Sequence, residues 1–369
     1  MSGTTNCTDV AFTEFVDVAD REELFEILDN SRILELSQMG GGEGFSSAQS
    51  IARSTGVETR RILSPGVDTL DVGVAVAEKL QDHVGFDWKD CPAIGLCHSH
   101  VEPDRARHLG RQLANHFGVD SSKFYSLNHG CAGFLELVRQ ATGRLIELPE
   151  KVHIPLLTVE TPDDWHDAAD RAFCGIVSVG ATGTTLWNGP GHRLLHAKTK
   201  NVRVPQEKRN NGTPLFHPVT RTSVDFFGEA RLKSVMTMDG EAVFENGAEL
   251  MLQACRKSHE EIEGLGRRVL VVPHQPSGKM LRALIATAGY EMQDVDFLNN
   301  LRHHGNMISS SIPSVLARLQ DVAAENGCQP VQDGDVIVLA VAGICMAHPA
   351  DHFAKGRAAL IWQDDAYRL

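Results

Sequence analysis

Residues 125–138, YSLNHGCAGFLELV, carry the pattern that decides the fold. A short apolar strand runs into a tight turn at Gly130, and an apolar helix follows. Cys131 is therefore expected at a helix N-terminus, where the free N–H groups and the helix dipole favour a thiolate. A thiolate can carry an acyl group covalently, and the N–H groups of the turn can bind an oxyanion. A buried, unreactive cysteine is the alternative interpretation.

Two later stretches place polar side chains at similar points. In residues 301–316, LRHHGNMISSSIPSVL, Asn306 follows a His-Gly pair at the start of a helix, and in VLVVPHQPSGKM His274 ends an apolar strand. Taken separately, Asn306 would be a helix N-cap and His274 a buried core histidine. Since α/β proteins usually build their sites at the carboxyl ends of strands, the thiol, imidazole and amide together predict an acyl-transfer site.

Composition limits the class of protein. The chain has 369 residues, 42% of them apolar and 22% charged, which is typical of a soluble globular protein of about two domains. The N-terminus lacks the pattern of a secretory signal, and no apolar run approaches the ~18 residues of a membrane span, so we expect no membrane association. A net charge of −13 argues against a nucleic-acid partner.

The eight cysteines show no framework spacing, which predicts reduced thiols and a cytoplasmic protein. They are at positions 7, 91, 97, 131, 174, 255, 328 and 345.

Strands alternate with helices along the chain, which predicts a mostly parallel, helix-covered sheet. We expect helices within 44–59, 68–85, 105–119, 242–262, 278–290 and 309–327, and strands within 91–100, 123–128, 267–275, 334–346 and 356–365. Residues 173–189 are expected to form a strand pair. The polar stretch near 188–224, rich in Pro, Asn and Gly, is expected to be an insertion or surface loop. The similar order of elements predicts two duplicated halves, 1–186 and 187–369, with the site at their junction.

The chain resembles the β-ketoacyl-acyl-carrier-protein synthase III branch of the thiolase superfamily over nearly its whole length. The matching stretches occur in the same order and spacing: STGVETRRI, LNHGCAGFLELV, MDGEAVFENGAELM, VVPHQPSGKMLRAL, HHGNMISSSIPSVL, GDVIVLAVAG and GRAALIW. Five or six blocks in order are far more specific than any one motif.

The resemblance implies a five-layered αβαβα thiolase-like fold of two pseudo-repeated halves, usually a homodimer. It also implies that Cys131 takes an acyl group from a thioester, and that His274 and Asn306 hold a malonyl-type thioester during decarboxylation. The resulting enolate would attack the acyl-cysteine. The substrates would be acyl-CoA or acyl-carrier-protein thioesters, with no further cofactor. His274 should act as a neutral N–H donor, its tautomer set by the contact of its other nitrogen.

Several positions depart from the family pattern. His129-Gly130 replaces two small residues, Gln275-Pro276-Ser277 replaces Gln-Ala-Asn, and SVGATG lacks the usual acid. The segment AGICMAHPADHFAKG is longer than the family's Gly-rich segment. Its Gly343 or Ile344 is the candidate for a second oxyanion N–H beside that of Cys131. These changes favour an acyl or acceptor substrate other than the usual acetyl primer.

Positive charge near the cavity mouth would hold the phosphopantetheine arm of CoA or a carrier protein. The candidates are Lys279, which is the best placed, Arg282 and Arg53, with Arg60 and Arg61 in the same block as Arg53. Solvated surface charge is the alternative for each of them.

Two other motifs carry less weight. Cys97-His98-Ser99-His100 puts His98 and His100 on one strand face, without further ligands at zinc spacing, so we expect no metal. GATGTT lacks the GxGxxG spacing of a dinucleotide site.

Two alternative functions remain open beside a condensing enzyme. An acyltransferase on the same scaffold would pass the Cys131-bound acyl group to a hydroxyl or amine. A catalytically silent partner subunit would not need the three site residues.

Overall fold

The computed structural model describes residues 10–39, 44–148, 151–292 and 294–364, so Cys7 lies outside the described part. The strands are β1 (Ala11–Phe12), β2 (Val16–Asp17), β3 (Phe25–Asp29), β4 (Thr59–Leu63), β5 (Ile94–Cys97), β6 (Phe124–Leu127), β7 (His153–Glu160), β8 (Gly180–Trp187), β9 (His192–Arg203), β10 (Phe216–Val224), β11 (Ala230–Met238), β12 (Val269–Pro273), β13 (Val295–Phe297), β14 (Val336–Ile344) and β15 (His352–Ile361). The helices are α1 (Asn30–Met39), α2 (Ala48–Thr55), α3 (Thr69–Val84), α4 (Arg105–Phe117), α5 (Gly133–Leu145), α6 (Gly240–Ile262), α7 (Gly278–Glu291), α8 (Leu301–His304), α9 (Ser311–Ala317) and α10 (Leu319–Glu325).

The main sheet repeats one pattern twice, in the order β13-β12-β14-β15-β9-β1-β8-β7-β5-β6. In one half β12 runs parallel to β13 and β14, and β15 returns antiparallel to β14. In the other half β5 runs parallel to β6 and β7, and β8 returns antiparallel to β7. Strand β1 pairs with both β8 and β9 and joins the two halves.

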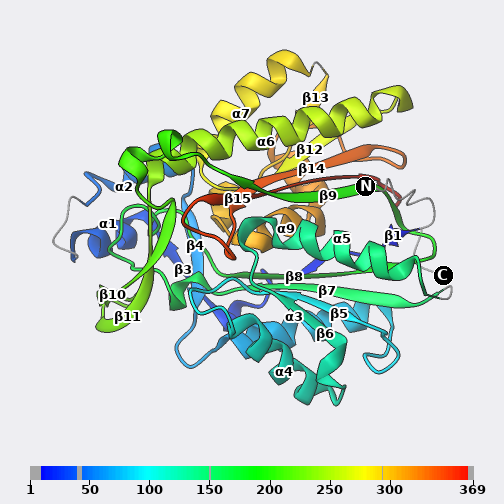
Figure 1. Cartoon of the computed structure of the whole chain (residues 1–369), viewed down its shortest axis with the longest axis horizontal. Coiled ribbons are helices and arrows are strands. Elements are labelled where there is room, and N and C mark those ends of the chain that lie inside the picture. Colours follow the sequence, from blue (N-terminus) through cyan, green and yellow to red (C-terminus); the bar gives the residue numbers. More distant parts are fainter. Residues whose placement is uncertain (1–9, 40–43, 149–150, 293, 365–369) are drawn as a thin grey trace.

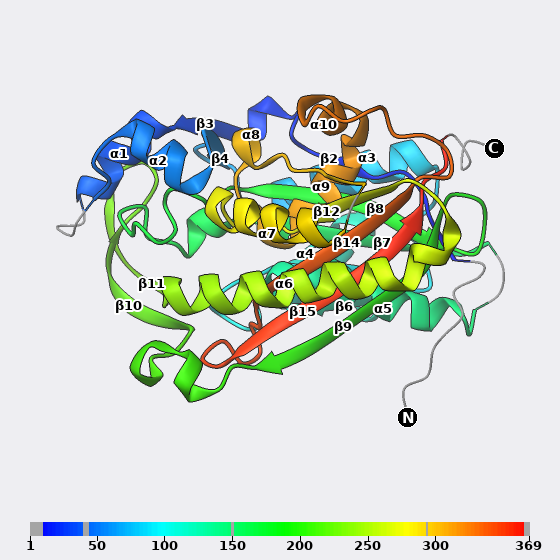
Figure 2. The ribbon, with the colours of Figure 1, turned by 90° about the horizontal axis from the view of Figure 1, so that it is seen from above.

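Five layers follow from this pairing (Figure 1). Helices α6 and α7 cover one half-sheet, α3 and α4 cover the other, and α5 and α9 lie between the two. Figure 2 shows α6 and α7 side by side over strands β14 and β15. The layers confirm the αβαβα arrangement expected from the sequence. The expectation of a mostly parallel sheet is wrong, because β1, β8, β9 and β15 all pair antiparallel.

Apolar patterning explains why the inner elements form. Every residue of β12 and β14 is buried, as expected of strands covered on both faces. Helix α3 begins at a capping box, in which the Asp68 carboxylate accepts from the N–H groups of Leu70 and Asp71. It ends at Gly85 in the left-handed conformation, a usual helix stop.

Backbone contact fixes α2 against α7. A Cβ on Gly56 would lie 2.8 Å from the Cα of Gly278, and one on Gly278 would lie 2.7 Å from the Cα of Gly56. Gly56 also has a φ of +74°, which favours glycine. The sequence pair STG and PSGKM therefore joins two segments more than 200 residues apart at close range.

Three expected elements differ in the structure. The segment 188–224 is not a surface loop, because β9 pairs with β15 along most of its length and β10 forms a hairpin with β11. Residues 173–189 contain one strand, β8, and the helix expected at 309–327 is interrupted at Arg318. Strand β9 is fixed by backbone pairing with a distant strand. Its side chains are partly exposed, so its sequence lacks the apolar pattern by which a strand is recognised.

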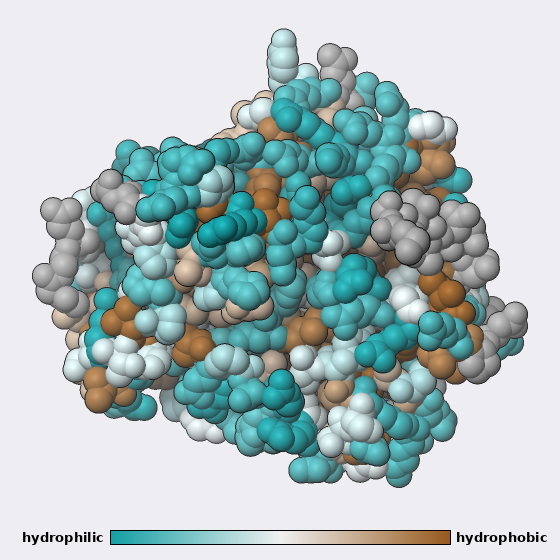
Figure 3. Space-filling view, viewed as in Figure 1, coloured by the Kyte–Doolittle hydropathy of each residue, from teal (hydrophilic) through white to brown (hydrophobic). Residues whose placement is uncertain are grey.

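The face shown in Figure 3 is mostly hydrophilic, with small separate apolar areas. Across the described ranges, no helix has the length and apolarity needed to cross a bilayer.

Candidate active site

Cys131 lies in a tight turn between β6 and α5. The turn is a 3-10 helix, η3 (Gly130–Ala132), and α5 begins directly after it. Gly130 has a φ of +61°, and a Cβ there would lie 2.6 Å from the carbonyl oxygen of Ile344. The chain therefore needs glycine before the cysteine. On the same strand as Ile344, a Cβ on Gly343 would lie 2.7 Å from the Cys131 sulfur, so β14 passes directly against the nucleophile.

The thiol of Cys131 is not a thiolate at rest, so this expectation from the sequence is wrong. Burial raises its pKa to about 12, and the nearby Glu160 carboxylate adds to the effect. The side chain is partly exposed and lines a cavity. Because the α-helix begins two residues later, the dipole does not offset the cost of burying a charge.

His274 follows β12, and its backbone N–H donates to the carbonyl of Ala340 at 2.8 Å. The side chain is 1% exposed, and neither ring nitrogen has a hydrogen-bond partner within the described part of the chain. Burial lowers its pKa to about 3, so the imidazole is neutral at physiological pH. Contrary to our expectation, no hydrogen bond from the described residues sets its tautomer.

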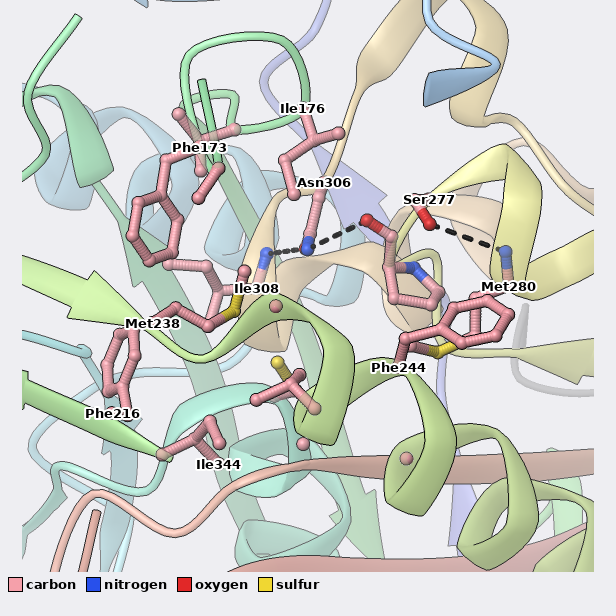
Figure 4. A pocket seen from close by; sticks show the side chains of 18 of the residues that line it. Phe173, Ile176, Phe216, Met238, Phe244, Ser277, Met280, Asn306, Ile308 and Ile344 are labelled. Atoms are coloured by element: carbon pink, nitrogen blue, oxygen red, sulfur yellow. Dashed lines mark hydrogen bonds between the residues drawn. The ribbon is translucent and has the colours of Figure 1, made fainter. Parts of the chain in front are cut away.

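Asn306 is oriented by its own turn. Gly305 before it has a φ of +63°, and the Asn306 N–H donates to the carbonyl of Ile176 at 2.7 Å. The side-chain oxygen accepts from the N–H of Ile308 at 2.9 Å, while Nδ2 lies 3.4 Å from the Pro276 carbonyl (Figure 4). The amide oxygen is thus occupied, and Nδ2 is left as the donor on the cavity side.

All three side chains line one cavity of about 670 Å³. In Figure 4, Phe173, Phe216, Met238 and Ile344 lie to one side of Asn306, and Phe244 and Met280 lie to the other. The wall is largely apolar, with aromatic and aliphatic residues from both halves: Phe45, Trp165, Phe173, Ile176, Val177, Phe216, Met238, Val243, Phe244, Met280, Ile308, Ile344, Met346 and Phe353. It suits an apolar acyl group.

Ile344 is directed toward the Cys131 turn. The N–H of Cys345 donates to the carbonyl of His352, so that opposed pair is of the hydrogen-bonded type. Pair types alternate along an antiparallel ladder, so the next pair, Ile344 with Phe353, is not hydrogen-bonded. The N–H and carbonyl of Ile344 therefore point away from β15, in agreement with its carbonyl facing Gly130.

The expected cationic residues separate into two groups. Lys279 is exposed and lines the cavity, with its ammonium 4.6 Å from the ring centre of Phe244. Arg282 and Arg53 are exposed but are not among the described residues that line the cavity, and Arg282 donates to the Arg53 carbonyl at 3.0 Å. Arg171, which the sequence analysis missed, lies at the cavity.

Arg60 and Arg61 are not surface charges. Arg60 is fully buried in β4 and donates to the carbonyls of Leu28, Glu58 and Gly175. Arg61 is half-buried beside His304, and its guanidinium lies 2.6 Å from the ring Nδ1. Neither arginine is among the described residues that line the cavity of Cys131.

His98 and His100 share one face, as expected, and their rings stack with centroids 6.0 Å apart. Within the described residues there is no group of three His, Cys, Asp or Glu that could hold a metal ion.

Comparisons with known proteins agree with this architecture. Residues 269–350 match the family model described as 3-oxoacyl-[acyl-carrier-protein] synthase III, C-terminal. The chain is 24% identical to β-ketoacyl-[acyl-carrier-protein] synthase III 1 of Streptomyces coelicolor over 294 residues, 74% of this chain and 80% of that protein. The chain is therefore synthase III-like in sequence.

Solved structures show the same fold for the synthase III-like chain. The priming β-ketosynthase of the R1128 polyketide pathway superimposes with a TM-score of 0.72 at 19% identity, covering 98% of this chain and 99% of that one. A tetronic acid condensing enzyme gives a TM-score of 0.68 at 16% identity, covering 95% and 99%.

The sequence analysis did not identify three residues at or next to the cavity: Glu160, Trp165 and His166. Trp165 and His166 line the cavity, and Glu160 accepts from the N–H of Ser99, which also lines it. Glu160 ends the apolar run HIPLLTVE, which is the same signal that identified His274.

Proposed function

We propose that this protein joins an acyl group to a malonyl-type thioester by decarboxylative Claisen condensation, with Cys131 as the nucleophile. The observation that carries the proposal is that one cavity holds Cys131 from the first half of the chain together with His274 and Asn306 from the second. His274 and Asn306 act as two neutral hydrogen-bond donors to one developing oxyanion.

Acylation comes first. The Cys131 sulfur attacks the thioester carbonyl, a new C–S bond forms, and the original C–S bond breaks to release the donor thiol. Because the Cys131 thiol is protonated at rest, its proton moves to the departing thiolate sulfur as the original C–S bond breaks. The N–H groups of Cys131 and Ile344 hold the oxyanion during this exchange.

Condensation follows in the same cavity. The malonyl carboxylate leaves as carbon dioxide, and its electron pair forms an enolate whose oxygen accepts from His274 Nε2 and Asn306 Nδ2. The enolate carbon attacks the acyl-Cys131 carbonyl, a C–C bond forms, and the Cys131 C–S bond breaks. The released thiolate regains a proton, and the β-ketoacyl thioester departs.

The wall favours an acyl group larger than acetyl. Phe173, Phe216 and Met238 give an apolar surface that an acetyl group would leave largely uncovered. Lys279 would bind the phosphate of the CoA or carrier arm at the opposite side. A homodimer in the cytoplasm remains a prediction.

Mass spectrometry of intact protein tests this function. Cys131→Ala should abolish acylation by a panel of acyl thioesters, and Asn306→Ala should retain acylation but lose carbon dioxide release from malonyl thioesters. Cys255→Ala is the matched control, because that buried thiol is not among the described cavity residues. Acylation of the Cys131→Ala variant at the parental rate would refute the proposal. Discharge of acyl-Cys131 by alcohols or amines, without carbon dioxide release, would instead identify an acyltransferase.

A further inference from the structure

A buried carboxylate lies next to the cavity, outside the roles assigned above. Glu160 ends β7 and has no exposed surface. One of its oxygens accepts from the N–H of Ser99 at 2.9 Å, and the other accepts from the Ser99 hydroxyl at 3.0 Å and from the Ser309 hydroxyl. A buried carboxylate needs such donors, and here they come from two separate segments.

The Ser309 contact reaches the turn that carries Asn306. Ser309 belongs to the 3-10 helix η8 (Ile308–Ser310), whose first residue donates to the Asn306 side chain. Ile308 has a φ of +50°, a conformation that a β-branched residue adopts only when the surroundings hold it there. The bond from Ser309 to Glu160 is a contact that holds this turn.

The other contacts of Glu160 reach the turn that carries Cys131. The Cys97 sulfur lies 4.0 Å from a Glu160 oxygen. It also packs against Gly133, the first residue of α5, where a Cβ would lie 2.1 Å from that sulfur. The carboxylate is near enough to Cys131 to oppose loss of the thiol proton. Among the described residues, the Glu160 charge raises the thiol pKa of Cys97 on β5 and of Cys131 on η3.

We propose that Glu160 is a positioning residue of this site, which ties the Asn306 turn to the strand ends beneath Cys131 and sets the reactivity of the Cys131 thiol by its charge. The part concerning the Asn306 turn rests on the condensation proposed above. The part concerning the thiol does not.

Alkylation of Cys131 by iodoacetamide, followed by mass spectrometry from pH 5 to 9, tests the charge effect. Burial raises the pKa of Glu160 to about 7, so in the parent protein this carboxyl group is protonated and uncharged at pH values well below 7. Glu160→Gln and the parent should therefore react alike below about pH 6. Above about pH 8 the variant should react about tenfold faster, since one unit in thiol pKa changes the thiolate fraction tenfold.

Asp163→Asn is the matched control. Asp163 follows in the same segment and is enclosed by protein, but its carboxylate accepts from the N–H of Leu63 instead. It should leave the alkylation profile unchanged. The charge effect would be overturned if Glu160→Gln and the parent showed the same alkylation rate at every pH. It would also be overturned if Asp163→Asn increased the alkylation rate as much as Glu160→Gln.

Ser309→Ala tests the positioning role while leaving the carboxylate in place. Because the Ser309 hydroxyl lowers the pKa of Glu160, its loss should shift the alkylation profile to higher pH. It should also lower kcat for condensation about tenfold, with KM for the malonyl thioester unaffected. An unchanged kcat would overturn the positioning role, and this variant remains informative if Glu160→Gln does not fold. If no thioester acylates Cys131 while Glu160→Gln still accelerates alkylation, the proposed function fails and the charge effect stands.

Discussion

Replacing Gly343 by alanine should disable the nucleophile. The added methyl would lie 2.7 Å from the Cys131 sulfur and 2.4 Å from its Cβ, whereas non-bonded heavy atoms settle at about 3.5–4.0 Å. The turn must therefore move by about 1 Å, because β14 is held in register by β15. A misplacement of about 1 Å in an active site can cost about 100-fold in rate, equivalent to about 2.7 kcal/mol, and overpacking costs about 1–3 kcal/mol of stability.

Single-turnover acylation of Cys131, followed by mass spectrometry, measures the first effect, and thermal unfolding measures the second. Gly143→Ala is the control, because Gly143 lies in α5 with open space around its Cα. That substitution should stabilise the helix by up to about 1 kcal/mol and leave acylation unchanged. Parental acylation and parental stability in Gly343→Ala would refute the close contact between β14 and the nucleophile.

Two further predictions concern His274 and Lys279. The pKa of His274 is about 3 in the fold and about 6.5 when unfolded, so the unfolded chain binds the extra proton and stability falls as pH drops from 6.5 toward 3. Between pH 7.5 and 5.5, the free energy of unfolding measured by denaturant titration should fall by about 1 kcal/mol more in the parent than in His274→Gln. An equal fall in both proteins would contradict a buried neutral imidazole. Lys279→Met should raise KM for acyl-CoA about fivefold with kcat unchanged, whereas exposed Lys257→Met should alter neither, and an unchanged KM would remove Lys279 from phosphate binding.

The sequence predicted the elements whose signals are local. Cys131, His274 and Asn306 each follow a short motif at the end of an element, and all three line one cavity. Buried strands such as β14 are apolar throughout, so they can be recognised from their own sequence without knowledge of their neighbours.

Properties set by distant partners could not be predicted in this way. Strand β9 has a polar, partly exposed pattern and is fixed by backbone pairing with β15. Arg60 carries a charge typical of a surface, yet three carbonyls from separate segments enclose it. The protonated thiol of Cys131 depends on Glu160 and on the surrounding protein, which no local motif reports.

One of the two-residue strands of the main sheet, β1, has a practical consequence. Its residues Ala11 and Phe12 bridge β8 to β9. Trimming the N-terminus to residue 13 would leave the two half-sheets without their common neighbour, although no cavity residue would be lost. Affinity tags are therefore better attached where residues 10–12 can still reach their pairing partners, and a shortened version that loses activity should first be checked for its melting temperature.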